Sequence, residues 1–184
     1  CALPISIILD KTGTLTYGAP ALTERLLAPG MDDGRVLQLA ASLERYSKHP
    51  LARPVLQAAE HLQLRLLDAA ELSERPGQGL EGVVDGTRVR ISGRRDSASL
   101  IGAAALPPSV SGLECVVSLD GVYAATFRFH DAARSDSAPF ISHLQPRHHL
   151  DRILLVSGDR RAEVQYLAER VGITDVHAEC SPEE

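Results

Sequence analysis

The chain has 184 residues, of which 44% are hydrophobic, and its 24 acidic residues outnumber 19 Lys and Arg to give a formal net charge of −5. This length allows one domain or two small ones with a real core, and the acidic balance with scattered basic residues excludes nucleic acid as a partner. No apolar run approaches the roughly 18 to 20 residues that a membrane-spanning helix needs.

The first predicted element is an apolar strand, Ile5–Leu9, followed directly by the heptad Asp-Lys-Thr-Gly-Thr-Leu-Thr at residues 10–16. A strand that ends in an acid and a Thr/Gly turn presents one carboxylate at the carboxyl edge of a parallel sheet, where ligands of open α/β folds bind. Asp10 is therefore a candidate nucleophile that forms an aspartyl-phosphate. Lys11 supplies a neighbouring cation, and Gly13 lets the backbone turn so that the following amides and hydroxyls can donate to phosphate oxygens.

Position 12 refines this hypothesis. Phosphatases with this kind of strand and loop usually carry a second Asp two residues after the nucleophile, which protonates the leaving group and activates water, but this chain has Thr12. Without that acid, a phosphoenzyme lacks an internal means of rapid hydrolysis and can persist. The heptad resembles the phosphorylation motif of P-type cation-transporting ATPases.

The next stretch, between roughly residues 20 and 125, predicts an α+β insert. After a break in the pattern at Tyr17–Pro20, a helix is capped near Asp32 and carries its apolar residues at helical spacing, and a second helix begins at Pro50. Two hairpins follow, each with Asp-Gly between β-prone runs, at 83–89 and 116–123. The Ala, Ser and Pro-rich stretch 97–111 predicts a mobile loop.

The pattern of a parallel sheet then returns. We expect a helix at 134–144, a buried strand at 152–156, a helix at 160–171 closed by Gly172, and a weak strand at 175–178. The chain thus leaves the strand of the candidate nucleophile, builds a separate domain and comes back. This organisation matches P-type ATPases, in which a nucleotide-binding domain is inserted into a phosphorylation domain. The fold class expected is α/β, with a partial haloacid-dehalogenase-like domain (1–19 and 126–184) around an α+β nucleotide-binding domain (20–125).

Within that insert, further motifs are similar to those of the heavy-metal branch. The stretch from Glu44 to His49-Pro-Leu resembles a Ser-Glu-His-Pro-Leu segment with a Glu five residues before the His, although Lys48 replaces the usual acid. The resemblance implies that Glu44 accepts from the adenine amino group and that His49 supports the base. Gly77 and Gly79 begin a Gly-x-Gly-x-x-Gly pattern. We expect these glycines to leave the backbone free of side chains, so that adenine and ribose can lie against it. As a structural alternative, His49 only packs or caps a helix, and the glycines only form a loop.

The phosphorylation domain carries two more resemblances. Asp131 and Arg134 match an Asp-x-x-Arg that the family places at the domain hinge near the ribose and phosphates, although Asp131 could instead cap a helix. Ser157-Gly158-Asp159 resembles a Thr-Gly-Asp whose hydroxyl binds the transferred phosphoryl group. We expect Asp159 to orient the loop or cap the next helix rather than to bind metal.

The cofactors that the resemblance implies are ATP and Mg²⁺. Mg²⁺ would have the carboxylate of Asp10 and the carbonyl of Thr12, plus waters, and such an incomplete site binds weakly. The resemblance also implies a cytoplasmic part of an integral membrane protein that transports a heavy-metal cation. Its actuator and transmembrane domains lie outside this chain, and the fragment alone is expected to be inactive.

Two other functions remain open. A soluble haloacid-dehalogenase-type phosphatase requires a general acid at position 12, against which Thr12 argues. In a catalytically inactive nucleotide-binding module, the insert would bind nucleotide but no phosphoryl group would be transferred. The cysteines Cys1, Cys115 and Cys180 have the spacing of neither a disulfide framework nor a metal site, which favours reduced thiols.

Overall fold

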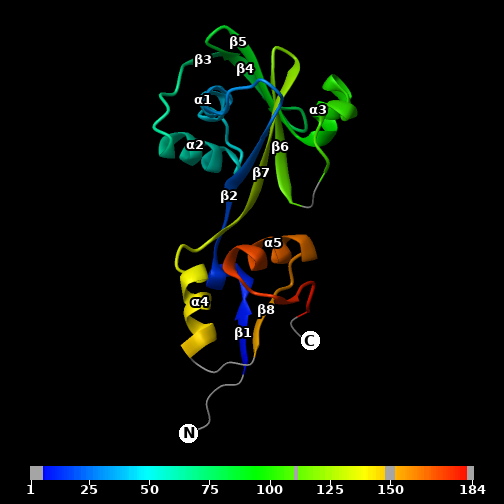
Figure 1. The fold of residues 1–184 in the computed structure, drawn as a ribbon. Helices are drawn as coiled ribbons and strands as arrows, with labels where there is room; N and C mark the ends of the chain where they lie inside the picture. The colour runs from blue at the N-terminus through cyan, green and yellow to red at the C-terminus, as the bar shows by residue number, and fades with distance from the viewer. Residues whose placement is uncertain (1–5, 110–111, 148–151, 182–184) are drawn as a thin grey trace. The chain divides into compact units, whose positions relative to one another are not determined.

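The chain forms two compact units in the computed structural model, which describes residues 6–109, 112–147 and 152–181 (Figure 1). The first unit combines Cys1–Ala19 with His130–Glu184, and the second is Pro20–Phe129. The second unit is therefore an insert in the first. The return to the first unit falls at residue 130, inside a long strand, whereas the sequence predicted a return at 126.

The first unit contains a three-stranded parallel sheet with the strand order β1-β8-β9. Its elements are β1 (Ser6–Asp10), α4 (Ser137–Arg147), β8 (Arg152–Val156), α5 (Arg161–Val171) and β9 (Asp175–His177). The three strands and α5 confirm the sequence prediction, and Gly172 ends α5 in the left-handed conformation with φ 83°. The helix expected from 134 begins instead at Ser137, because 134–136 still belong to the turn after β7.

The core of this unit lies between its helices and the parallel sheet. Apolar side chains at helical spacing on α4 and α5 meet the alternating inward residues of β8, so burial follows the two periodicities. The buried residues are Leu15, Ile141, Leu144, Ile153, Leu155, Val164, Leu167, Ala168, Val171 and Ile173. This packing fixes the end of β1, where the candidate nucleophile lies.

The second unit is built on a six-stranded sheet with the order β2-β7-β6-β5-β4-β3, antiparallel in its ladders from β7 to β3. Its strands are β2 (Thr16–Leu27), β3 (Ala69–Arg75), β4 (Gly79–Val84), β5 (Thr87–Ser92), β6 (Leu113–Leu119) and β7 (Val122–Ala133). The strands β2 and β7 also carry the chain between the two units. The expectation that Tyr17–Pro20 breaks the pattern is wrong, because β2 runs through it; Gly18, with φ 71°, is accommodated within the strand.

The two Asp-Gly hairpins form as predicted. Asp85 and Gly86 have φ of 52° and 75°, and Asp120 and Gly121 have φ of 50° and 79°. Positive φ at both central residues defines the type I′ turn, whose twist suits two-residue hairpins. These turns set the β4–β5 and β6–β7 registers.

The helices of this unit are α1 (Asp33–Glu44), α2 (Ala52–His61) and α3 (Arg94–Ile101), with a short 3₁₀ turn, η2 (Ala103–Ala105). The predicted cap is present: the Asp32 carboxylate accepts a hydrogen bond from the Arg35 amide at 2.7 Å. The second helix begins at Ala52, two residues after Pro50, because the His49–Leu51 segment forms a turn.

The mobile loop predicted for 97–111 is wrong over most of its length. α3 and η2 occupy 97–105, and the hydroxyls of Ser92 and Ser97 lie 2.7 Å apart in a buried contact that anchors α3 to the end of β5. A helix of Ala, Ser and Arg shows little apolar periodicity, so its tertiary contact was not visible in the sequence. Residues 110 and 111 lie outside the described residues.

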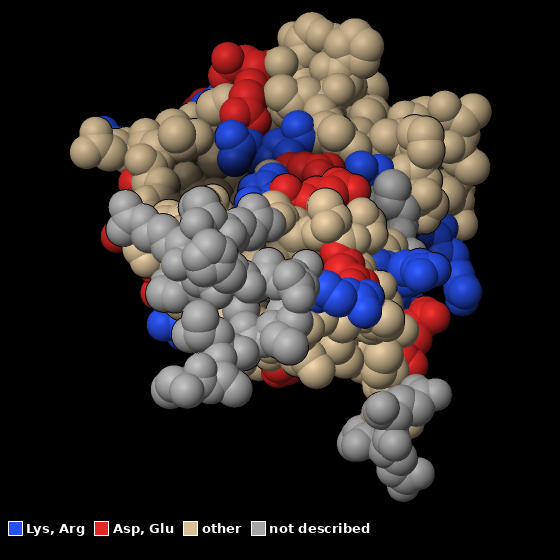
Figure 2. Space-filling model, turned by 60° about the horizontal axis from the view of Figure 1, so that its bottom comes forward, with Lys and Arg blue, Asp and Glu red and all other residues tan. Residues whose placement is uncertain are grey.

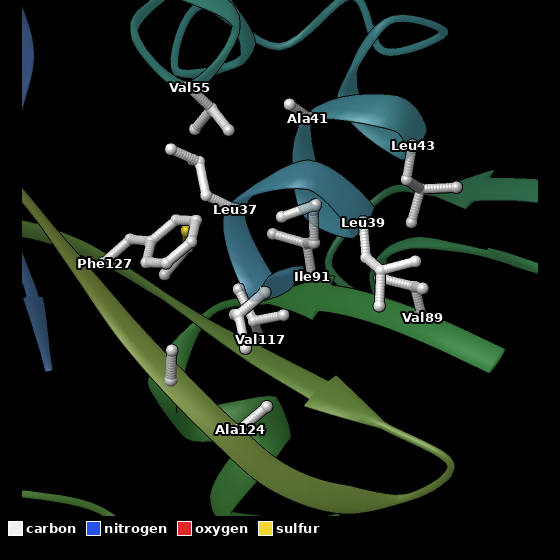
Figure 3. Packing of buried hydrophobic residues seen from close by; sticks show 14 of the residues in the cluster. Leu37, Leu39, Ala41, Leu43, Val55, Val89, Ile91, Val117, Ala124 and Phe127 are labelled. Carbon is white, nitrogen blue, oxygen red and sulfur yellow. The ribbon is translucent and has the colours of Figure 1, made fainter. Parts of the chain in front are cut away.

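Figure 3 shows the core of the second unit, in which α1 packs on the inner face of β5, β6 and β7. Leu37, Leu39 and Leu43 of α1 lie among strand residues, and Val55 of α2 lies above them. The largest buried side chains of this cluster are Phe127 and Phe129, which are 0% and 1% exposed. The apolar face of α1 and the inner face of the sheet therefore form one core. The end of α1, at Glu44, lies at the edge of this core.

On the face drawn in Figure 2, Lys and Arg side chains are interspersed with Asp and Glu. Many of the arginines of the described residues are paired, for example Arg25 with Asp33 at 2.6 Å and Arg90 with Asp96 at 2.8 Å. Among the described helices, none combines the length and hydropathy needed to cross a bilayer.

Candidate functional site

Asp10 is the last residue of β1 and pairs in register with Val156, the last residue of β8. Both strands are parallel, so the side chains that follow them meet at one edge of the sheet, as the sequence predicted. The Asp10 side chain is exposed, and within the described residues it makes no hydrogen bond or ion pair. Directly after it, Gly13 adopts φ 78°, a conformation that glycine allows at little cost. The turn therefore leaves an unengaged carboxylate facing solvent.

Lys11 lies beside this carboxylate in the sequence, but its own side chain is buried. Its ammonium is 2.6 Å from Asp159 and 3.6 Å from Asp131. A buried ammonium is stable only when it is paired, and here two carboxylates share it. Asp159 thus orients the loop after β8 by holding Lys11. It does not cap α5, whose N-cap is Arg160, without a side-chain hydrogen bond.

Asp131 accepts hydrogen bonds from the Thr16 hydroxyl at 2.6 Å and from the Ala19 amide at 3.0 Å. These contacts tie the end of β7 to the start of β2, where the chain leaves and re-enters the first unit. Asp131 therefore does not cap a helix. Arg134, from the same motif, lies 3.6 Å from Asp136 and stacks over the Tyr17 ring at 5.3 Å.

Ser157 follows β8 and is buried. Its hydroxyl accepts a hydrogen bond from the Asp159 amide at 3.2 Å, and its backbone is bonded to both His177 and Cys180. A hydroxyl that accepts one hydrogen bond can still donate another. The structure thus brings Asp10, Lys11 and Ser157 to one edge of the parallel sheet.

The residues expected to hold Mg²⁺ offer oxygen atoms as ligands. Magnesium takes oxygen ligands and keeps several waters, which suits an exposed, unengaged carboxylate at Asp10 and the carbonyl of Thr12. Within the described ranges, no group of three or more His, Cys, Asp or Glu gathers in a way that could hold a metal. The donors present fit a hydrated Mg²⁺ held by a single carboxylate.

The second unit contains a pocket of about 680 Å³ that brings together all four nucleotide-binding residues predicted there. It is formed by the end of α1, the turn before α2, the β3–β4 turn and the ends of β5 and β6. Glu44, His49, Gly77 and Gly79 line it, together with Ser47, Lys48, Pro50, Leu51, Glu74, Arg75, Pro76, Leu80, Ile91, Ser92, Gly93, Glu114 and Cys115. This volume lies in the range of small-molecule sites.

Glu44 is the buried acid of this pocket. Its side chain is 5% exposed, and its Oε2 atom is buried without a hydrogen-bond partner in the described structure. Burial raises the pKa of Glu44 to about 7, the Ser47 hydroxyl lowers it, and the nearby Glu74 carboxylate raises it. An unsatisfied buried acceptor is costly, so this oxygen is suited to a donor that a ligand brings.

The two predicted glycines differ in what they do. At Gly77, an added Cβ would meet no atom within 4 Å, in keeping with backbone open to a ligand. At Gly79, the Cβ would lie 2.2 Å from the Ile91 carbonyl and 2.6 Å from the Cβ of Ser92. Glycine at 79 therefore allows β4 to approach the end of β5, which is a different reason from the one expected.

His49 lines the pocket and also makes a local contact: its Nδ1 accepts a hydrogen bond from the Leu51 amide at 3.2 Å. The structural alternative of capping the turn before α2 is thus realised alongside a place in the pocket. The pocket also contains strand residues for which the sequence predicted no role in binding, such as Arg75, Glu114 and Cys115. Arg75 comes from β3 and the other two from β6, and no local motif marks them.

Comparison with known proteins shows the family to which the chain belongs. The family model of haloacid dehalogenase-like hydrolases matches residues 6–184. A copper-transporting P-type ATPase of Rhizobium leguminosarum bv. viciae is 32% identical over 97% of this chain and 22% of its own length. The probable copper-transporting ATPase PacS of Synechococcus elongatus is 34% identical over 97% of this chain and 25% of its own length. The chain thus spans about a quarter of the length of these curated relatives.

Solved structures show the same relationship. The structure of a zinc-transporting PIB-type ATPase aligns with a TM-score of 0.78 and 27% identity, over 98% of this chain and 30% of that one. The N-domain of HMA6, a copper-transporting P-type ATPase, aligns with a TM-score of 0.50 and 25% identity, over 60% of this chain and 98% of that domain. The chain belongs to the haloacid dehalogenase-like hydrolase family, and its relatives there are heavy-metal-transporting P-type ATPases.

Proposed function

We propose that this chain is the ATP-binding and phosphoryl-accepting cytoplasmic part of a heavy-metal-transporting P-type ATPase. The observation that carries the proposal is the exposed, unengaged carboxylate of Asp10 at the carboxyl edge of the parallel sheet, beside Lys11 and Ser157. In this role the Asp10 carboxylate attacks the γ-phosphorus of ATP, the bond to the β–γ bridging oxygen breaks, and ADP leaves. The product is an aspartyl-phosphate that drives ion movement through domains outside this chain.

The neighbouring residues suit a mainly electrostatic mechanism. The Ser157 hydroxyl can donate to an oxygen of the transferred phosphoryl group, and the amides after Asp10 add further donors. Lys11, held by Asp131 and Asp159, keeps a positive charge next to the nucleophile. Asp10 and Thr12 would hold Mg²⁺, which supplies further positive charge to offset that of the phosphates.

ATP occupies the pocket of the second unit in this proposal. Its adenine amino group donates to the unpaired Oε2 of Glu44, which satisfies that buried oxygen. His49 supports the base, and the backbone at Gly77 is open to it. Asp131 and Arg134 act at the hinge where the chain passes between the units.

The actuator and transmembrane domains of the pump are the partners that this proposal requires. The transported ion is a heavy-metal cation, for which copper is the ion named in the curated relatives and zinc the ion named in a solved neighbour. The ligands that select this ion belong to the membrane part.

The test is made in the longer protein that contains this chain. With γ-labelled ATP, it is expected to form an acid-stable phosphoenzyme that hydroxylamine cleaves, as an acyl phosphate requires. Asp10→Asn should abolish the label, because the amide is a poor nucleophile, while ATP binding is retained. Glu169→Gln, at an exposed acid on α5 of the same unit, is the matched control and should keep the label. Undiminished label in Asp10→Asn would overturn the proposal.

A further inference from the structure

The pocket of the second unit has a charge arrangement that the nucleotide-binding motifs do not explain. Two basic side chains, Lys48 and Arg75, line it, and both are exposed. Neither makes an ion pair with another described residue, although the chain as a whole carries a net charge of −5. What sets these two cations apart is that both line the same pocket.

The acids that line the same pocket are largely compensated. Glu114 is paired with Arg94 and lies 3.7 Å from Arg128. Glu44 is buried, and its burial favours the neutral acid. Glu74 is the remaining acid of the lining, and the two basic side chains outnumber it there.

A hydrogen bond brings these cations to the same mouth. The Ser47 hydroxyl donates to Glu74 Oε1 at 2.7 Å, and these two residues directly precede Lys48 and Arg75 in the chain. The turn after Ser47 is further fixed by the His49 amide, which donates to the Ser47 hydroxyl at 3.0 Å. Arg75 is fixed from its other side, because it ends β3 in register with Gly79. Both basic residues are thus attached to ordered backbone.

The pocket has a buried apolar end and an exposed charged rim. Leu80, Ile91 and Cys115 lie at its buried end, and the exposed Lys48 and Arg75 lie at its rim. An apolar end suits a flat base, whereas a polyanion stays at the rim, where it keeps part of its hydration. Lysine binds phosphate as a compact charge, and arginine binds it through a planar fork.

We propose that Lys48 and Arg75 bind the phosphate chain of the nucleotide and orient it with its base inward. This inference rests on the proposed binding of ATP in the pocket and adds the residues that distinguish ATP from adenosine. It assigns to Lys48 and Arg75 a role in binding and none in the transfer step.

The experiment measures the affinity of the 184-residue chain for ATP and adenosine by titration calorimetry or amide chemical shifts. Lys48→Gln and Arg75→Gln are each expected to weaken ATP binding about two- to fivefold, as for an exposed ion pair, and the double variant more. Adenosine affinity should stay within about 1.5-fold of the original, since the base contacts are intact. Added salt should weaken ATP binding in the original chain and have less effect in the double variant. Arg53→Gln, an exposed cation on α2 outside the pocket, is the matched control and should change neither affinity.

The outcomes separate this inference from the proposed function. Equal ATP affinity in the original chain and the double variant overturns the role of the two cations and leaves the nucleotide site standing. A parallel loss of ATP and adenosine affinity also overturns it, because the substitutions then alter the pocket itself. If neither ATP nor adenosine binds the original chain, the nucleotide site fails and the inference fails with it.

Discussion

The ammonium of Lys11 lies 2.6 Å from the carboxylate of Asp159, which joins the turn after β1 to the loop after β8. Lys11 is buried, whereas Asp159 is about half exposed. The candidate nucleophile directly precedes Lys11, so this ion pair helps to fix the backbone that presents it. The contact is a property of the parallel pairing of β1 and β8.

A double-mutant cycle should detect this ion pair. Lys11→Met is expected to destabilise the first unit by about 1 to 3 kcal/mol, because Asp131 and Asp159 then lose their shared cation. Asp159→Asn should cost less, and the coupling between the two changes should be about 0.5 to 1 kcal/mol, since solvent screens the exposed partner. Urea unfolding followed through amide exchange of β8 reports on this unit. Strictly additive single changes would show that the two residues do not interact.

Gly79→Ala should destabilise the second unit far more than Gly77→Ala. Both glycines have positive φ, so both changes introduce about 1 to 2 kcal/mol of backbone strain. Only at 79 does the new methyl group collide with backbone atoms of Ile91 and Ser92, which raises the expected loss to about 2 to 5 kcal/mol. Thermal or urea unfolding of the two variants measures the difference. Equal losses would contradict the close approach of β4 to β5.

Stability of the second unit should fall as pH rises, through Glu44. Burial raises its folded-state pKa to about 7, above the ordinary value of 4.5 that it has when unfolded. The folded state therefore binds the proton more tightly, so the contribution is complete below about pH 4.5 and is lost as pH rises through about 7. The shift corresponds to about 3 kcal/mol. Urea unfolding between pH 5 and 8 measures this decline.

The control for this pH dependence is a matched pair of substitutions. Glu44→Gln removes the ionisation and should flatten the profile between pH 5 and 8, whereas Glu60→Gln, an exposed acid on α2, should leave it unchanged. A profile for Glu44→Gln as steep as that of the original chain would assign the decline to another group.

The 184-residue chain should show almost no phosphatase turnover. Thr12 occupies the position from which an acid would protonate the leaving group and activate water. Among the described residues, no group of three or more His, Cys, Asp or Glu could hold a metal ion. Release of p-nitrophenol from p-nitrophenyl phosphate in the presence of Mg²⁺ is the measurement. Brisk turnover that Asp10→Asn abolishes would instead favour a soluble phosphatase.

The sequence by itself determined the elements that local preferences dictate. The apolar run before Asp10 predicted β1, Gly13 predicted the turn, and the Asp-Gly pairs predicted two type I′ hairpins. In each case the conformation depends on residues adjacent in the chain, whose steric limits and hydrogen bonds are local. The same reasoning found α1 through its cap and apolar stripe but missed α3, whose side chains carry no such stripe.

Only the tertiary structure decided which of these residues meet. Strand register and contacts between distant segments decide three features of the sites. These are the partners of Lys11, the contact of Gly79 with β5, and the charged rim at Lys48 and Arg75. Register is set by the simultaneous burial of many side chains, so no short motif carries it. For that reason the sequence named a glycine at 79 and a lysine at 11, and the folded chain supplied the physical role of each.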